Sequence, residues 1–354
     1  MTRTETPRSA AGPGRVRPHG ALRVGPWSLR PAPRALVTGV ALVLVAFAVA
    51  VAAISTGEFT VPVPDVLTAL FGQGTPVAEL IVGKLRAPRV VTGLLVGAAF
   101  GLSGALFQSV TRNPLGSPDF IGFTAGASTG GILAVVTGGT AAQVAGGSMV
   151  GCVLTAALVY GLAFRRGVQG YRLVLVGIGA NALLISVNSY LLTRANINDA
   201  ATAGAWLTGS LGGRGWDHAV PVGLALAALL PVCAYVSRPM RMIEMGDDTA
   251  RSMGINVEVV RAAAVTAGVL LCGVATAAAG PVAFVALAAP QLARRLTRSP
   301  GVTLTASALV GAVLLTLSDL VAQRLIAPQQ LPVGVVTAAI GGVYLALLLR
   351  KDRH

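Results

Sequence analysis

The chain has 354 residues, of which 54% are hydrophobic and 11% are charged, and its formal net charge at pH 7 is +14. Soluble domains carry about 25% charged residues, so this composition excludes an ordinary soluble protein and predicts one that crosses a membrane many times. The basic residues fall between apolar runs and form no stripe with interleaved aromatic residues, which argues against a nucleic-acid-binding surface. We therefore interpret the positive charge as a signal of membrane topology.

Residues 1–34 are rich in Arg, Pro, Gly and Ser, and we expect them to form a disordered basic tail. A transmembrane helix needs about 20 mostly apolar residues. Residues 35–350 contain uncharged runs for ten such helices, and 351–354 form a short C-terminal tail. The runs are 35–57, 90–111, 120–164, 173–193, 219–237, 262–293, 299–318 and 325–349.

Two of these runs are long enough to hold two spans each. We divide 120–164 at a predicted turn over 137–148. We divide 262–293 at Gly280–Pro281, because a proline inside a helix costs about 3 kcal/mol. With both termini in the cytoplasm, the inner segments carry 21 of the 27 Lys and Arg residues. The positive-inside rule favours this arrangement, so the predicted fold is an all-α bundle of about ten transmembrane helices in a cell membrane.

Glycines recur at four-residue spacing in "GAAFG" (97–101) and "GASTG" (126–130). Small residues at this spacing let helix backbones approach closely inside a membrane. The pattern predicts a tightly packed bundle and does not by itself indicate a function.

The segment "FQSVTRNPLGSPDFIGF" (107–123) places two prolines between two predicted spans. Pro114 and Pro118 keep the helices from merging, and Asn113 or Asp119 can cap a helix start. From the residues alone, a tight and well-capped turn is sufficient to explain the segment.

A second polar segment, "GDDTARSMGIN" (246–256), has the residues of a helix, a glycine elbow and another helix. Asp247 or Asp248 suits a helix start, Gly254 suits its end, and Asn256 can cap the next helix. A simple connector at the membrane surface is the alternative. The residues expected on its exposed face are Ala250, Met253 and Ile255.

Polar residues near or within the spans allow two interpretations each. Arg86 and Arg89 are three residues apart at the start of a span, where they could snorkel to the interface or bind a partner. Asn181 and Asn188 share one face of the span 173–193, with Ser189 beside them. Such side chains either bond to neighbouring helices or line a water-filled path.

Nucleotide and metal motifs are not recognisable in this sequence. A P-loop requires a lysine followed by Ser or Thr, whereas Lys84 and Lys351 precede Leu85 and Asp352. The cysteines and histidines are isolated and show no metal or disulfide pattern. We expect the chain to bind no metal or cofactor, so ATP, if it drives transport, must bind to another subunit.

Five stretches, in order from about residue 80 to residue 350, resemble the permease subunits of type II ABC importers for ferric siderophores, haem and cobalamin. The variants at 112–119, 244–250 and Gln330–Pro332 are most similar to the ferric-enterobactin branch. The five stretches are "LRAPRVVTGLLVGAAFGLSGALFQSVTRNPLGSPDFIGF", "RLVLVGIGANALL", "EMGDDTARSMGINVEVVR", "AGPVAFVALAAPQLARR" and "LPVGVVTAAIGGVYL".

The resemblance implies a non-enzymatic subunit of the bacterial plasma membrane. A second permease subunit, identical or homologous, would complete the path for a ferric siderophore. Two ATPase subunits that bind ATP and Mg²⁺ would dock on the cytoplasmic side, and a substrate-binding lipoprotein would dock outside.

The resemblance also implies roles for individual residues. The cytoplasmic gate would comprise Asn113, Pro114, Leu115, Gly170 and Tyr171. The coupling helix, in the loop at about 238–260, would comprise Gly246, Asp247, Asp248, Thr249, Ala250, Arg251, Met253 and Gly254. The binding protein would dock at Arg86, Arg89 and Arg324, and the pathway would be lined by Asn181, Asn188 and Ser189.

Two other kinds of protein must be weighed against an importer subunit. An ion-coupled secondary transporter keeps carboxylates near the membrane midplane, whereas Asp119 and Asp319 are predicted at helix ends or in loops. A non-transporting scaffold would need neither the elbow at 246–256 nor the arginine pair. If the chain is an importer subunit, haem and cobalamin are the alternatives to a ferric siderophore as the substrate.

Overall fold

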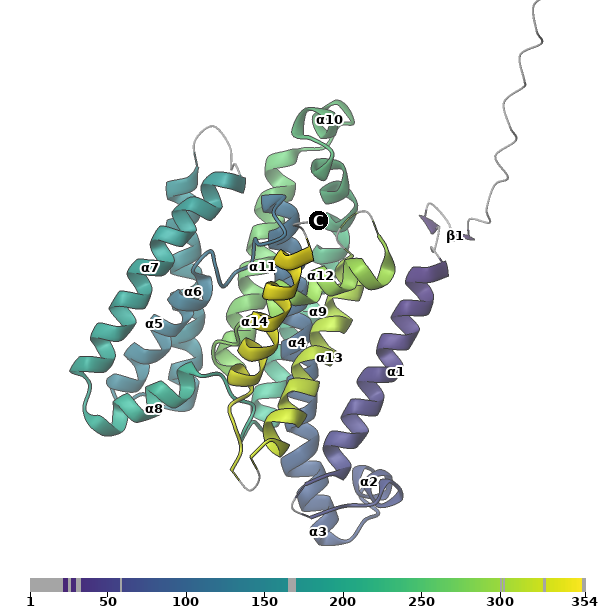
Figure 1. Ribbon diagram of the computed structural model, residues 1–354, viewed down its shortest axis with the longest axis vertical. Helices are drawn as coiled ribbons and strands as arrows, with labels where there is room; N and C mark the ends of the chain where they lie inside the picture. The colour runs from purple at the N-terminus through teal and green to yellow at the C-terminus, as the bar shows by residue number, and fades with distance from the viewer. Residues whose placement is uncertain are drawn as a thin grey trace, which may run out of the picture.

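The computed structural model describes residues 22–24, 27–29, 33–57, 59–164, 170–299, 301, 303–326 and 329–351. These residues form a bundle of helices with one short strand pair before it (Figure 1). The elements are β1 (Leu22–Val24), β2 (Trp27–Leu29), α1 (Pro33–Ser55), α2 (Val63–Leu70), α3 (Pro76–Glu79), the π-helix η1 (Leu80–Arg86), α4 (Ala87–Thr111), α5 (Phe123–Val136), α6 (Ala141–Ala163), α7 (Gly170–Arg194), α8 (Ile197–Leu207), α9 (Trp216–Glu244), α10 (Asp247–Ser252), α11 (Val257–Ala279), α12 (Val285–Thr297), α13 (Leu304–Arg324) and α14 (Val333–Lys351).

Among the described residues, seven helices are long and apolar enough to cross a membrane. They are α1, the continuous segment α3–η1–α4, α6, α7, α9, α11 and α13. Each of the other three predicted spans also has a helix at its position, but α5, α12 and the apolar part of α14 are shorter. The chain is therefore a multi-pass membrane protein, and the count of ten stays a prediction.

Two predicted breaks can be compared with the structure. The break at Gly280–Pro281 is confirmed, because α11 ends at Ala279 and Gly280 has a positive φ of 75°. The predicted turn at 137–148 is too long. Helix α6 already begins at Ala141, where the side chains of Thr140 and Gln143 form a capping box.

The predicted disordered tail, residues 1–34, lies mostly outside the described residues. Within it, β1 pairs with β2 in antiparallel register. The end of the predicted C-terminal tail, residues 352–354, also lies outside the described residues.

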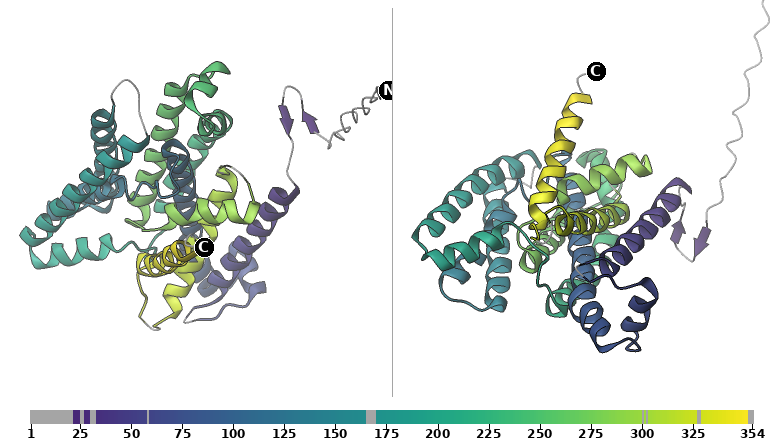
Figure 2. Two further views of the ribbon diagram at one scale, coloured as in Figure 1. Left: turned by 45° about the horizontal axis from the view of Figure 1, so that its top comes forward. Right: turned by 60° about the horizontal axis from the view of Figure 1, so that its bottom comes forward.

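Helix α4 forms the centre of the bundle and packs against α9, α11, α12 and α13 (Figure 1). Helices α5 to α8 form a group on one side of α4, and α1 lies on the opposite side in both views of Figure 2. The apolar core of buried side chains follows this centre and includes Phe100, Phe107 and Leu271. Since α4 contacts so many neighbours, residues near its ends are well placed to connect distant parts of the chain.

Glycines allow the closest helix contacts, as the four-residue spacing predicts. A Cβ atom at Gly97 would lie 2.3 Å from the carbonyl oxygen of Gly311, and one at Gly101 would lie 2.2 Å from that of Ser307. Both contacts join α4 to α13. A Cβ at Gly130 would lie 2.0 Å from the Gly147 carbonyl oxygen, between α5 and α6. The prediction of close packing at both glycine motifs is confirmed.

The bundle has two ends, which we name after the elements that lie there. Helix α10 marks one end, and α2 and α3 mark the other (Figure 1). The first turn of α1 and the last turn of α14 both point towards the α10 end. The placement of both termini on the cytoplasmic side of the membrane stays a prediction.

Candidate functional site

An open pocket with a mostly apolar wall and several polar side chains lies between α5, α7, the end of α8 and the break between α11 and α12. Its volume is about 420 Å³. All three residues predicted to line a pathway, Asn181, Asn188 and Ser189, line this one pocket. The other polar side chains in its wall are Asp119, Thr124 and Ser128.

Asn188 bonds to a neighbouring helix, which is one of the two interpretations of its sequence position. Its amide oxygen accepts a hydrogen bond from Thr129 Oγ1 at 2.7 Å, and its Nδ2 donates to the Ala125 carbonyl at 3.3 Å. It therefore ties α7 to α5 and also borders the pocket. Ser189 is exposed, and its hydroxyl donates to the carbonyl of Ile185 within α7.

Asp119 lies deeper in the bundle than we expected from the sequence. The loop 112–122 runs back into the helices, and at Gly122, with a φ of 89°, it passes so close to α7 that a Cβ would lie 3.0 Å from the backbone nitrogen of Asn181. Asn181 is near the middle of α7. The carboxylate of Asp119 accepts a hydrogen bond from Thr124 Oγ1 at 2.9 Å and another from the backbone amide of Phe284.

Asp119 lies in the turn between α4 and α5, as the sequence predicts. The sequence does not show that this turn packs against the middle of α7. One signal for this packing was present in the sequence. The run 120–164 must hold two helices, and its length leaves only 14 residues for the first of them, α5.

The predicted gate turn is held by hydrogen bonds on both sides. The Oδ1 atom of Asn113 accepts from the Leu115 amide at 2.9 Å, which closes the turn on itself. Gln291 of α12 donates to the Pro114 carbonyl at 2.5 Å, which fixes the turn to a neighbouring helix. Leu115 is exposed beside these anchored residues. A rigid turn with an exposed apolar tip is suited to narrowing a pore.

The second predicted gate element lies beside the first. A Cβ on Gly170, the first residue of α7, would lie 2.8 Å from the Cα of Thr111 at the end of α4. Gly170 therefore packs directly before the gate turn. Tyr171 is 76% exposed and makes no part of this contact surface. The preceding residues, 165–169, lie outside the described part of the chain.

The elbow predicted at 246–256 is present. Gly246 precedes α10, Gly254 ends the turn with a φ of 80°, and the Asn256 side chain accepts from the Val259 amide to cap α11. Met253 is 58% exposed, as expected. Ile255 is half-buried.

The expected exposure of Ala250 is wrong. Its side chain is fully buried in the main apolar core, together with Ile243 of α9 and Val257 of α11. The elbow folds back onto the helices that flank it, and the sequence does not reveal which face of so short a helix turns inward. A bulky substitution at Ala250 would therefore unfold the elbow and would not test docking.

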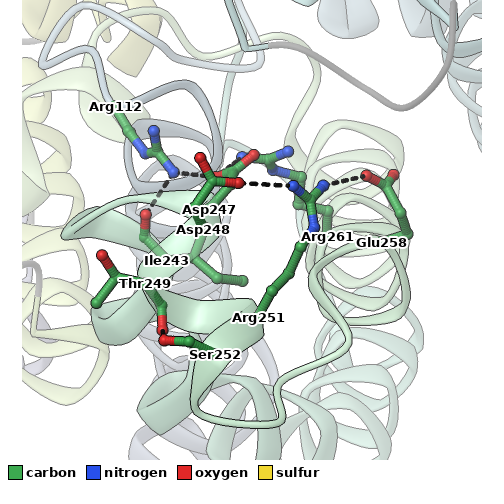
Figure 3. Close-up of polar contacts among 9 residues, drawn as sticks. All are labelled: Arg112, Ile243, Asp247, Asp248, Thr249, Arg251, Ser252, Glu258 and Arg261. Atoms are coloured by element: carbon green, nitrogen blue, oxygen red, sulfur yellow. Dashed lines mark hydrogen bonds and ion pairs between the residues drawn. The ribbon is translucent and has the colours of Figure 1, made fainter.

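Charged residues connect the elbow to two other helices (Figure 3). The carboxylate of Asp247 accepts hydrogen bonds from Arg112, at the end of α4, and from Arg261 of α11, the latter at 2.8 Å. Arg112 also donates to the Ile243 carbonyl. Burial by itself raises the pKa of Asp247, but the hydrogen bonds and charges of Arg261 and Arg112 outweigh burial, so the pKa is lower than usual. Asp247 is therefore ionised at neutral pH.

A second set of charges lies on the exposed side of the elbow. Arg251 pairs with Asp248 at 3.2 Å and approaches Glu258 at 3.9 Å. Asp248 is fully exposed and Arg251 is half-exposed. Exposed pairs of this kind contribute about 0–1 kcal/mol, so they do little to hold the elbow in place.

At the α2–α3 end, the two arginines of the predicted pair serve different neighbours. Arg89 forms a two-point ion pair with Asp319 of α13, with both N–O distances 2.9 Å, and also donates to Gln330 at 2.7 Å. Arg86 instead donates to the carbonyls of Ile54 and Phe59, next to α1. Both side chains therefore have partners within the chain, and their role in docking a binding protein stays a prediction.

Asp319 lies in the last two turns of α13, near a helix end as predicted, but its side chain is only 5% exposed. Gln323, one turn later, donates to it at 2.8 Å. Arg324 is exposed. Of the three arginines predicted to meet a binding protein, Arg324 is thus the one with an accessible side chain, while Arg86 and Arg89 have partners within the chain.

Several known proteins are similar to this chain along nearly its whole length. The model of the FecCD transport family matches residues 41–351. The chain is 43% identical to the ferric enterobactin transport system permease protein FepG of Escherichia coli (strain K12), over 90% of this chain and 97% of that protein. It is 37% identical to the achromobactin transport system permease protein CbrC of Dickeya dadantii (strain 3937), over 88% and 90% of the two chains.

A solved structure has the same fold. It is an inward-facing conformation of a metal-chelate type ABC transporter, and one of its chains superposes with a TM-score of 0.77 at 24% identity, over 90% of this chain and 99% of that chain. The arrangement of helices described above is thus one that a transporter of that type adopts.

Proposed function

Because the chain belongs to the FecCD transport family, whose model covers residues 41–351, we propose that it is the permease subunit of an ATP-driven importer of ferric siderophores. It forms one wall of the pathway in the bacterial plasma membrane. Two ATPase subunits, a second permease subunit and an external substrate-binding lipoprotein complete the importer. The chain itself catalyses no reaction and binds no cofactor, and ATP and Mg²⁺ bind to the ATPase subunits.

One observation carries this proposal beyond the family assignment. The gate turn at 113–115 and the α10 elbow lie at the same end of the bundle and are joined by the ion pair of Arg112 and Asp247. An external motor that moves α10 can thus act on the gate. To change the ratio of two gate states from 1:99 to 99:1, the motor must supply about 5.5 kcal/mol of differential binding free energy. We assign this free energy to the nucleotide-driven closure of the ATPase subunits.

The residues of the pathway and the docking surfaces have distinct roles in this proposal. Asn181, Asn188 and Ser189 line the route of the chelate, and Met253 lies on the surface that meets the ATPase. Arg324 contributes to docking of the binding protein. Rim charges of this kind mainly set the register and rate of association.

The proposed substrate is a ferric catecholate siderophore. The support is that the chain is 43% identical to a ferric enterobactin permease. Its 37% identity to an achromobactin permease supports a siderophore in general and not a catecholate in particular. The pathway residues are small and polar and give no sign of an individual chelate, so the external binding protein supplies most of the selectivity.

The direct test is uptake into proteoliposomes that contain the complete importer. We expect a ferric tris-catecholate, presented on the binding protein, to accumulate when ATP is present and the proton gradient is collapsed by an uncoupler. Uptake that requires the gradient and not ATP would identify a secondary carrier. Accumulation of haem or cobalamin, but not of ferric catecholate, would retain the importer and correct its substrate.

A further inference from the structure

A salt bridge between Arg112 and Asp247 connects the gate turn to the coupling elbow. Arg112 is the residue directly before Asn113, and it adopts a left-handed conformation with a φ of 49°. Such a conformation is uncommon for a residue other than glycine. It ends α4 and allows the guanidinium group to reach the Ile243 carbonyl at the end of α9 and the carboxylate of Asp247 on α10.

Asp247 is also held from the opposite direction. Its Oδ1 atom, which accepts from Arg112, accepts from Arg261 of α11 at 2.8 Å. The side chain of Arg261 is only 6% exposed, whereas that of Arg112 is 38% exposed. One partner is thus a buried anchor in the bundle, and the other is the residue directly before the gate turn (Figure 3).

The other charged contacts of α10 do not reach the gate. Asp248 pairs with Arg251 on the same helix, and Arg251 approaches Glu258 at the start of α11. A separate contact, in which Ser109 donates to Glu244, joins α4 to α9 without involving α10. Among the contacts of the described residues, the carboxylate of Asp247 is therefore the side-chain connection from the elbow to Arg112.

We propose that Asp247 is a positioning residue that couples the motor to the gate, by holding Arg112 and Arg261 on one carboxylate. This inference rests on the proposed function. When the ATPase subunits move α10, the shared carboxylate carries Arg112 with it, and Asn113 and Pro114 follow because they are the next residues in the chain. Asp247 touches neither substrate nor nucleotide.

The test compares two carboxylates in the complete importer in proteoliposomes, with a ferric tris-catecholate as the transported probe. In Asp247→Asn the charge that holds both arginines is lost. In the control Asp65→Asn an exposed carboxylate on α2, at the opposite end of the bundle, is lost. ATP hydrolysis and uptake are measured together. Coupling between sites commonly amounts to about 5–150-fold, and we expect uptake per ATP to fall roughly 10-fold in Asp247→Asn and to stay unchanged in Asp65→Asn.

A purely structural role of Asp247 would not lower the uptake per ATP in this way. Asp247→Glu keeps the charge and should recover most of the uptake per ATP, and Arg112→Gln should reproduce the loss from the gate side of the pair. In the double variant Arg112→Gln/Asp247→Asn, the loss should be no greater than in either single variant, because both remove the same connection.

Three outcomes would overturn the inference. The first is unchanged uptake per ATP in Asp247→Asn. The second is a parallel loss of hydrolysis and uptake, which would place Asp247 in docking alone. The third, decisive if Asp247→Asn fails to assemble, is unchanged uptake per ATP in Arg112→Gln. Absence of ATP-driven uptake in the wild-type importer would instead refute the proposed function.

Discussion

The Arg89–Asp319 pair gives the sharpest prediction about stability. Its two charged groups are buried to a similar degree, with side chains 14% and 5% exposed, and they meet through two N–O contacts of 2.9 Å. Removing one partner of a buried pair costs about 3–5 kcal/mol, because the other charge is left without compensation. In Arg89→Met, Asp319 would keep Gln323 as its hydrogen-bond partner but no opposite charge.

We therefore expect Arg89→Met to lower the free energy of unfolding by about 3–5 kcal/mol, measured by denaturant titration of the purified protein in mixed micelles. The double variant Arg89→Met/Asp319→Leu should recover most of this loss, since apolar replacement of both members of a buried pair is often neutral. The exposed Arg324→Gln should stay within about 0.5 kcal/mol of the wild type. A loss in Arg89→Met no larger than that in Arg324→Gln, together with weaker docking of the binding protein, would refute the structural role of Arg89.

Three further predictions concern packing, docking and pH. Gly97→Leu should prevent α4 from packing correctly against α13, because its Cβ would lie 2.3 Å from the Gly311 carbonyl oxygen. The control Gly39→Leu has open space around its Cβ and should leave the size-exclusion profile of the purified protein unchanged. Arg324→Gln should slow association with the binding protein several-fold at low salt and much less at high salt, as measured by surface plasmon resonance; an equal effect at both salt concentrations would contradict it. The lowered pKa of Asp247 means that its stabilising charge is complete above its ordinary pKa of about 3.9 and is lost only as the pH falls through the lower folded value. Uptake per ATP should therefore stay constant from mildly acidic to mildly alkaline pH, and a transition near neutrality would contradict this assignment.

Much of the fold follows from local patterns in the sequence. Apolar runs predict where helices form, and Gly97 and Gly101 predict where two of them approach closely. Gly254 and Asn256 likewise predict the end of one helix and the start of the next, because a left-handed turn and a side-chain cap need those residue types. Family membership could be predicted as well, since it depends on the order of several motifs.

Features that depend on tertiary packing could not be predicted in the same way. Ala250 is small and polar residues surround it in the sequence, yet the elbow folds back and buries it. Asp119 follows a proline in a polar turn, and its depth depends on how that turn packs against α7. Arg86 and Arg89 lie on one continuous helical segment, but their partners come from α1 and α13.

The connection of Asp247 to Arg112 shows the same limit for the candidate site. The two residues belong to different motifs and are separated by 135 positions in the sequence. Each motif suggests a local turn or helix, and only the packing of α4 beside α9 and α11 brings the charges together. The roles assigned to the gate, the elbow and the pathway residues stay predictions that the experiments above can decide.

The central claim is that the ATPase subunits dock at the α10 end of the bundle and move the gate turn from that end. It is tested most directly by labelling Met253→Cys with a membrane-impermeant maleimide, since the native cysteines Cys152, Cys233 and Cys272 are all buried. We predict that the new cysteine reacts from the cytoplasmic side in vesicles stripped of ATPase subunits and becomes protected when those subunits are added back. Reaction from the external side, or equal reaction with and without the ATPase subunits, would contradict the account.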